Sequence, residues 1–190
     1  MDSKLFGECL SKFIETTKSR LDVIKGTPSP TFFSIVLDCD TLAGINIDDF
    51  YDSLTLGKPS PVLYYYKIIS NHSPSEIKGF VRNYKDTYKK PNDDYLALPK
   101  VNDLRLNEIL YVGKSQKDFK SRLKNHFGLG SVTTYALHLS KWNTKLLVPK
   151  GLKLELYYTQ IPNVTDSDLV ELLESSLHHT LQPILGRSGH

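Results

Sequence analysis

Apolar and polar residues alternate with a period of two in parts of the chain, and this period predicts β-strands. The stretch from Gly151 to Ile161 shows it most clearly, because leucine and tyrosine take every second position from Leu152 to Tyr158. Two other runs are rich in the β-branched and aromatic residues that strands favour. After residue 60, the predicted strands are 62–69, 107–113 and 151–161.

Other stretches carry apolar residues three or four positions apart, which predicts helices. The predicted helices are 4–24, 75–89, 117–127, 133–143 and 168–182. The helix at 75–89 should begin near Ser73 or Ser75. A capping box of Ser115 with Asp118 should open the helix at 117–127, and one of Thr165 with Asp168 the helix at 168–182. Pro183 should end the last helix. Between these elements, residues 91–103 have the composition of a loop.

A second proline-marked stretch, GKPSP at 57–61, divides the chain in two. Before it we expect the helix that ends near Gly26, a short buried strand at 31–40 and a short acidic helix or turn at 46–54. We treat residues 1–60 as an N-terminal addition of unknown role. Residues 61–190 then form a compact α/β (α+β) domain.

The positive charge belongs to this second part. Residues 1–60 hold six Lys/Arg against nine Asp/Glu, whereas residues 61–190 hold eighteen against twelve. A basic domain suits a polyanionic partner, because neutralising phosphates releases counterions. The chain has no run of eighteen apolar residues and no signal segment at its start, so we expect no membrane partner and a soluble, cytoplasmic protein.

Three stretches together resemble the GIY-YIG nuclease superfamily: VLYYYK at 62–67, LYVGKSQKDFKSRLKNH at 110–126 and LLESSLHHTLQP at 172–183. Tyr111 opens the Tyr-Val-Gly half of the motif, and Arg122 follows it by eleven residues. His126 comes four residues later, as in restriction-type members, and Glu174 precedes a proline by nine residues. The resemblance implies a small, mainly antiparallel three-stranded sheet flanked by helices.

The chain departs from the family pattern at three places. Val62 replaces the first glycine of the motif, so Tyr64, Tyr65 and Tyr66 all remain candidates; aligning VLY with GIY selects Tyr64. Tyr64 and Tyr111 lie 47 positions apart, which requires an insertion at about 71–107. Gly186 stands where the family often has asparagine.

The resemblance implies a DNA endonuclease that uses Mg²⁺ or Mn²⁺, with a tyrosine near the attacking water. Tyr64 is the first choice and Tyr111 the second, and Lys114 could lower the pKa of a phenol or contact phosphate. The fixed fork of Arg122 suits two phosphate oxygens. With Phe119, Leu123 and Phe127 toward the core, Arg122 and His126 share another helix face and could reach one cleft.

Glu174 is the expected metal ligand. On a helical wheel it borders the apolar stripe of 168–182, whereas Glu171 points farther toward solvent. A carboxylate beside apolar residues needs a cationic partner, and a divalent metal ion is a natural one.

Basic residues of the insertion and of the arginine-bearing helix are candidates for DNA contact, although a charged helix surface would look the same. They are Lys78, Arg82, Lys85, Lys89, Lys90 and Lys124. A type II restriction enzyme is one candidate within the family, and a homodimer or successive nicks would cut both strands. The competing class is a nucleic-acid-binding module that kept the fold and lost activity.

Overall fold

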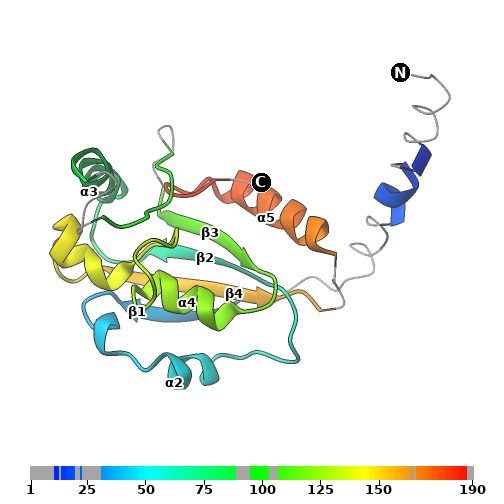
Figure 1. The fold of residues 1–190 in the computed structure, drawn as a ribbon, viewed down its shortest axis with the longest axis horizontal. Helices are drawn as coiled ribbons and strands as arrows, with labels where there is room; N and C mark the ends of the chain where they lie inside the picture. Colours follow the sequence, from blue (N-terminus) through cyan, green and yellow to red (C-terminus); the bar gives the residue numbers. More distant parts are fainter. Residues whose placement is uncertain are drawn as a thin grey trace.

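The computed structural model describes residues 11–12, 14–19, 22, 31–88, 95–102, 107–162, 164 and 166–187 (Figure 1). The helix expected at 4–24 falls largely outside these residues. Within it, residues 11–12, 14–19 and 22 are helical, as predicted.

The centre of the fold is an antiparallel sheet with the strand order β1-β4-β2-β3. Its strands are β1 (Phe33–Asp38), β2 (Val62–Ile68), β3 (Ile109–Ser115) and β4 (Lys153–Gln160). The three strands predicted after residue 61 and the mixed α/β class are confirmed. The expected three-stranded sheet is wrong, however, because β1 from the N-terminal addition pairs with the outer edge of β4, from Phe33 opposite Tyr158 to Asp38 opposite Lys153.

The expected burial of this first strand is also wrong, since β1 is an edge strand. Leu37 faces the core with 2% of its surface exposed, whereas Val36 is 57% exposed. The apolar run at 31–37 therefore faces the core at alternate positions only.

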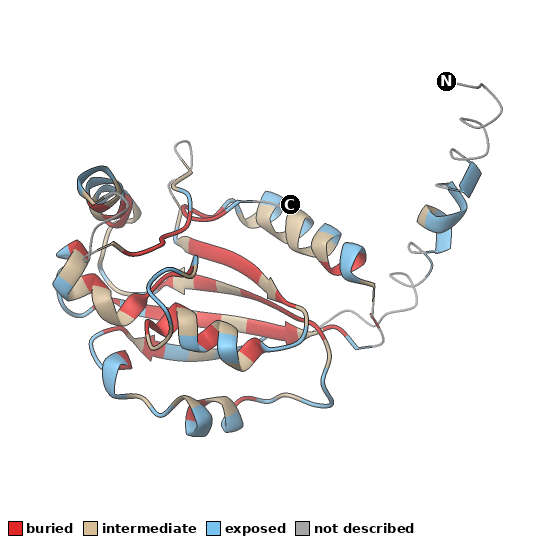
Figure 2. Ribbon diagram, in the orientation of Figure 1, coloured by how far each residue is buried: buried red, intermediate tan, exposed pale blue. Residues whose placement is uncertain are grey.

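The side chains of β2 separate two hydrophobic clusters, one on each face of the sheet. Tyr64 and Tyr66 join the larger cluster, on the face covered by α4 (Phe119–Phe127) and α2 (Ile47–Asp52) (Figures 1 and 2). Leu63 joins the smaller cluster with α5 (Ser167–Leu181). On α4, the predicted core residues Phe119, Leu123 and Phe127 are all buried.

Several helix boundaries differ from their predicted signals. Asp118 caps α4 by accepting from the backbone N–H of Ser121, whereas Ser115 is a buried residue of β3 and takes no part in a capping box. Asp166 caps α5, and Thr165 lies outside the described residues. The single helix expected at 133–143 is replaced by a 3-10 turn η2 (Leu139–Lys141) and a π-helical turn η3 (Trp142–Leu146).

The insertion contains the predicted helix α3 (Pro74–Thr87), which Ser73 and Glu76 open with a capping box. After it, residues 95–102 are irregular, as expected, but they are not a surface loop. Leu96, Ala97 and Leu98 are buried. The chain here hydrogen-bonds the segment after α5, through Asn102 N to Ile184 O and Gly186 N to Lys100 O.

The segment after α5 also holds that helix beside β3 (Figure 1). Ile184 N donates to Ile109 O and Leu185 N donates to Leu110 O, and Leu185 forms an isolated β-bridge with Tyr111 of β3. This arrangement places α5 beside β3 at one edge of the sheet, while α4 lies over the face. No helix in the described ranges is long and apolar enough to cross a membrane.

Candidate active site

The guanidinium of Arg122 joins three parts of the chain at this edge. Its Nε donates to the phenol oxygen of Tyr64 on β2 at 3.0 Å, and one terminal nitrogen donates to that of Tyr111 on β3, also at 3.0 Å. The other terminal nitrogen donates to the backbone oxygen of Tyr135 at 3.2 Å. Residues far apart in sequence therefore converge on one cation.

Gly113 makes room for this convergence. It lies opposite Tyr64 in the antiparallel register, and both phenol rings lean over it. A Cβ atom at this position would lie 2.6 Å from the Tyr64 hydroxyl and 2.8 Å from the Tyr111 ring. The glycine of the Tyr-Val-Gly motif thus allows the two phenols to approach the same guanidinium.

The structure separates the three candidate tyrosines of β2. Tyr65 points to the opposite face, where its ring stacks on Tyr157 with centroids 4.6 Å apart. Tyr66 is fully buried, and its hydroxyl finds no hydrogen-bond partner among the described residues. Only Tyr64 of the three bonds Arg122.

His126 does not share a cleft with Arg122, which corrects the sequence prediction. Its side chain is fully buried behind Tyr64, with Nε2 2.9 Å from the phenol oxygen. The backbone N–H of Leu137 donates to Nδ1 at 3.2 Å, so a neutral imidazole carries its proton on Nε2 and donates it to Tyr64. Leu137 thus contacts α4 on the face that carries His126.

Burial governs the titration of these groups. It raises the pKa of Tyr64 and of Tyr111, and the nearby Arg122 opposes both shifts. Burial also lowers the pKa of His126 well below its usual value, with Arg122 adding to the effect. The phenols are therefore protonated and the imidazole neutral at neutral pH. The cation that acts on the phenols is Arg122 and not Lys114, which corrects one of the two roles predicted for that lysine. The other role, contact with phosphate, stays a prediction.

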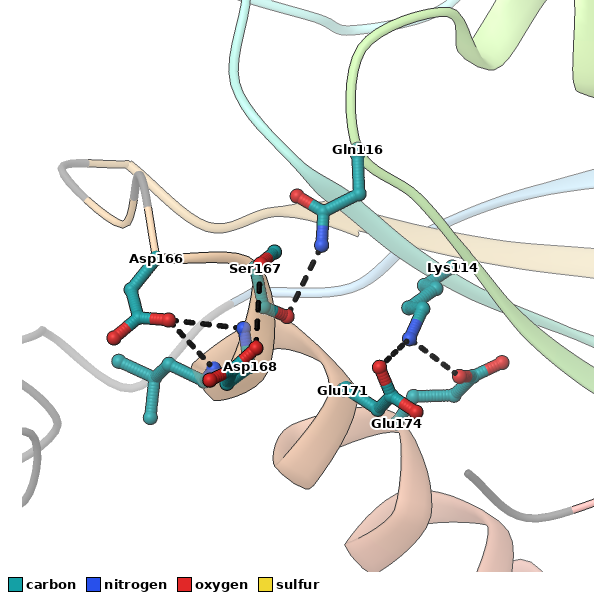
Figure 3. A network of polar contacts seen from close by, with 8 residues as sticks. Lys114, Gln116, Asp166, Ser167, Asp168, Glu171 and Glu174 are labelled. Carbon is teal, nitrogen blue, oxygen red and sulfur yellow. Dashed lines mark hydrogen bonds and ion pairs between the residues drawn. The ribbon is translucent and has the colours of Figure 1, made fainter. Parts of the chain in front are cut away.

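Lys114 lies on the α5 side of β3 and bridges two carboxylates (Figure 3). Its Nζ is 3.2 Å from Glu171 and 3.4 Å from Glu174. The side chain of Glu174 is 13% exposed against 29% for Glu171, as the helical wheel predicted. Burial raises the pKa of Glu174, while Lys114 and Arg122 lower it. Gln116 further ties β3 to the start of α5.

Arg122 and Glu174 line one pocket of about 690 Å³, together with Tyr111 and the exposed ring of Tyr135. The cations that line it are Lys85, Lys100, Lys114, Arg122 and Arg187, and Glu174 is the one acidic residue among its described lining residues. Such an excess of positive charge in a concave site suits an anion. Tyr64 and His126 stand behind the pocket wall.

The predicted DNA-contact residues separate into several environments. Lys78 is buried at 5% exposure, which removes it from a contact surface and corrects that prediction. Arg82 on α3 and Lys124 on α4 are exposed. Lys85 donates to the backbone oxygens of Leu98 and Pro99 at 3.0 and 2.9 Å and lines the pocket. Lys89 and Lys90 lie outside the described residues.

Sequence reasoning missed Tyr135, Lys100 and Arg187, because no motif marks them and only the fold brings them to the pocket. The departure at Gly186 has a structural reason. Its φ is +110°, and a Cβ there would lie 3.3 Å from the Tyr111 ring, so glycine suits this position better than asparagine.

Glu174 is the residue through which a metal ion could be held at this pocket, since its other described lining residues are neutral or cationic. The described part of the chain contains no group of three or more His, Cys, Asp or Glu side chains placed to hold a metal. Comparisons of the chain with family models, with curated proteins and with solved structures found no match. The structure itself shows a mixed α/β fold with a basic pocket at the β3 edge.

Proposed function

We propose that this chain is a divalent-metal-dependent DNA endonuclease with a GIY-YIG-like core. One observation carries the proposal: Arg122 forks between Tyr64 and Tyr111 at a pocket that also contains the carboxylate of Glu174. For phosphodiester hydrolysis, a guanidinium can stabilise charge on the phosphoryl oxygens and an acid can hold a metal ion. A phenol beside them can contact the attacking water.

Arg122 would hold the scissile phosphate. Three of its five N–H groups are engaged, by Tyr64, Tyr111 and the Tyr135 carbonyl. The two that remain, one on each terminal nitrogen, match two phosphoryl oxygens and would stabilise the charge that these oxygens gain.

Tyr111 would contact the attacking water, because it lines the pocket and Tyr64 does not. Tyr64 accepts from both Arg122 and His126, so its role would be to position the guanidinium. This division reverses the order of preference drawn from the sequence. Arg122 also stabilises the phenolate form of Tyr111 against the effect of burial.

Glu174 fits a magnesium or manganese ion of the kind that is held by one carboxylate, waters and a substrate phosphate. Its carboxylate is largely buried and already has a cationic partner. Lys114 could then keep its second partner, Glu171, when Glu174 binds the metal. The bound ion would supply positive charge at the phosphoryl and leaving oxygens.

The alternative is a nucleic-acid-binding module without activity, and a type II restriction enzyme is the narrower form of the endonuclease proposal. The presence of Tyr111, Arg122 and Glu174 at one pocket favours activity. One such pocket per chain would require a homodimer or successive nicks to cut both strands.

Nicking of supercoiled plasmid in Mg²⁺ tests the proposal. We expect wild type to nick and Glu174→Ala to lose at least about 100-fold in rate, the size typical of removing a group that stabilises the transition state. Glu171→Ala is the matched control, because it removes the other carboxylate of Lys114 and should retain most activity.

Equal inertness of wild type and both variants, with DNA binding intact, would favour the binding module. Equal nicking by wild type and Glu174→Ala would show that Glu174 holds no essential metal.

A further inference from the structure

A cluster of three cations lines the pocket beside the proposed catalytic groups. It comprises Lys85 from α3, Lys100 from the irregular segment and Arg187 from the end of the chain. None of the three takes part in the Arg122 or Lys114 contacts described above. We infer that this cluster, which we call the second anion subsite, binds a phosphate adjacent to the scissile one; the inference rests on the proposed function.

Hydrogen bonds to backbone carbonyls link the three segments. The ammonium of Lys85 donates to the carbonyls of Leu98 and Pro99, the two residues directly before Lys100. The carbonyl of Lys100 accepts from the N–H of Gly186, the residue directly before Arg187. The cluster is thus part of the folded framework, although its members come from three separate stretches.

The electrostatics agree with a site for an anion. The pKa of the Lys85 ammonium is lowered, first by its own partial burial and second by the positive charge of Arg187. The two cations therefore lie close to each other. Like charges held near one another are destabilising on their own, and a bound phosphate would relieve the repulsion. The carboxylate that lines this pocket, Glu174, is paired with Lys114.

The subsite lies next to the catalytic groups. Gly186 approaches the Tyr111 ring so closely that a Cβ atom would lie 3.3 Å from it, and the hydroxyl of the same ring accepts from Arg122. A strand whose scissile phosphate bonds Arg122 would place a neighbouring phosphate at Lys100 and Arg187. The insertion would then act inside the pocket through Lys85 and residues 95–102, and not through an exposed face of α3 in a DNA groove.

A second phosphate site implies that the substrate is a polynucleotide with several phosphates, and not a mononucleotide ester. It also predicts a specific salt dependence of binding. Each phosphate neutralised in duplex DNA contributes about 0.9 to the slope of log Kd against log salt. The ammonium of Lys85 is already bonded to two carbonyls, so Lys100 and Arg187 supply the exposed charges that hold the phosphate. If the two serve one phosphate, removing both charges should reduce the slope by about 0.9, and not by about twice that.

The test measures binding of a fluorescein-labelled, random-sequence DNA duplex at several NaCl concentrations, with EDTA present so that nothing is cut. Wild type is compared with Lys100→Gln/Arg187→Gln, whose two side chains are exposed and should not affect folding. The matched control is Lys58→Gln/Lys150→Gln, which removes two exposed charges outside this pocket. In the plasmid assay the first pair should raise KM and leave kcat largely intact.

A slope reduced by about 0.9 in the first pair alone supports the subsite. An unchanged slope, a doubled loss or an equal loss in the control pair overturns it. If the slope falls as expected but wild type nicks no plasmid, the subsite stands and the endonuclease fails. If wild type nicks plasmid with no change of slope in the variant, the endonuclease stands and the subsite fails. Absence of both duplex binding and plasmid nicking by wild type overturns both proposals.

Discussion

At the scale of single residues, Gly113 is the position where the site has least room. Replacing it with alanine would push a methyl group into the rings of Tyr64 and Tyr111. We expect Gly113→Ala to lower the free energy of unfolding by about 1–3 kcal/mol, the usual cost of overpacking a core. Urea unfolding followed by circular dichroism measures it.

Gly79 offers the matched control, because it is an exposed residue of α3 and a Cβ atom added there would meet no heavy atom within 4 Å. Gly79→Ala should stabilise the chain by about 0.5–1 kcal/mol through helix propensity. Destabilisation by both changes, or by neither, would contradict the crowding at Gly113.

His126 predicts a pH dependence of stability. Burial lowers the pKa of His126 in the folded chain. As the pH falls below about 6.5, the imidazole therefore takes up a proton in the unfolded chain but stays neutral in the folded chain. The folded state is therefore favoured above about pH 6.5 and loses stability as the pH falls, by up to about 1.4 kcal/mol per pH unit.

His126→Gln keeps a side-chain N–H for Tyr64 but cannot titrate. Urea unfolding at several pH values should show a shallower acid loss for this variant than for wild type. Some loss should persist, because burial lowers the pKa of His138 as well. Parallel curves for the two proteins would mean that His126 is not buried in its neutral form.

At this scale, the residues singled out by the sequence can be compared with those that line the pocket. Arg122, Tyr111 and Glu174 were found through motif spacing, and the wheel of α5 correctly separated Glu174 from Glu171. Helix periodicity wrongly placed His126 in the same cleft as Arg122. The period shows which side chains of α4 share a face, but it does not show that Leu137 packs against His126 on that face.

At the scale of elements, the turn η3 ends in a strained residue. Leu147 has a φ of +59° and is 71% exposed. Burial of its side chain therefore contributes little to offset the steric cost of the left-handed backbone. We expect Leu147→Gly to raise the free energy of unfolding by about 1 kcal/mol.

Leu147→Ala is the control, since it removes the same leucine side chain and keeps the steric penalty at Cβ. Thermal unfolding should place Leu147→Gly above wild type and Leu147→Ala near it. If alanine stabilises as much as glycine, loss of the exposed leucine is the cause and not the backbone.

Elements with a regular period were predicted well, whereas irregular ones were not. The alternation in β4 and the apolar spacing in α4 and α5 follow directly from strand and helix geometry. Residues 95–102 have no period, yet Leu98 and its neighbours are buried by tertiary contacts with the segment after α5. Composition alone predicts a surface loop for such a stretch.

At the scale of the whole molecule, β1 shows that the division at residue 60 separates parts of one sheet. A sequence can indicate a strand but not its neighbour, so the pairing of β1 with β4 was not foreseen. If this part of the N-terminal addition belongs to the core, Leu37→Ala should destabilise the whole chain by about 2–5 kcal/mol.

The neighbouring Val36 is the control, because it lies on the same strand and is 57% exposed. Val36→Ala should change the stability by no more than about 0.5 kcal/mol. One cooperative urea transition, shifted by Leu37→Ala alone, is the expected result. A separate early transition for residues 31–60 would instead make them an independent unit.

Leu137 has a consequence that reaches beyond its contact with the imidazole. Its N–H donates to His126, and its carbonyl accepts from the indole of Trp142, the single tryptophan of the chain. All indole emission therefore comes from a ring that one residue, Leu137, connects to the Tyr64–His126 pair. Intrinsic fluorescence should consequently report on the integrity of this site without any added label, with a red shift wherever water reaches that peptide.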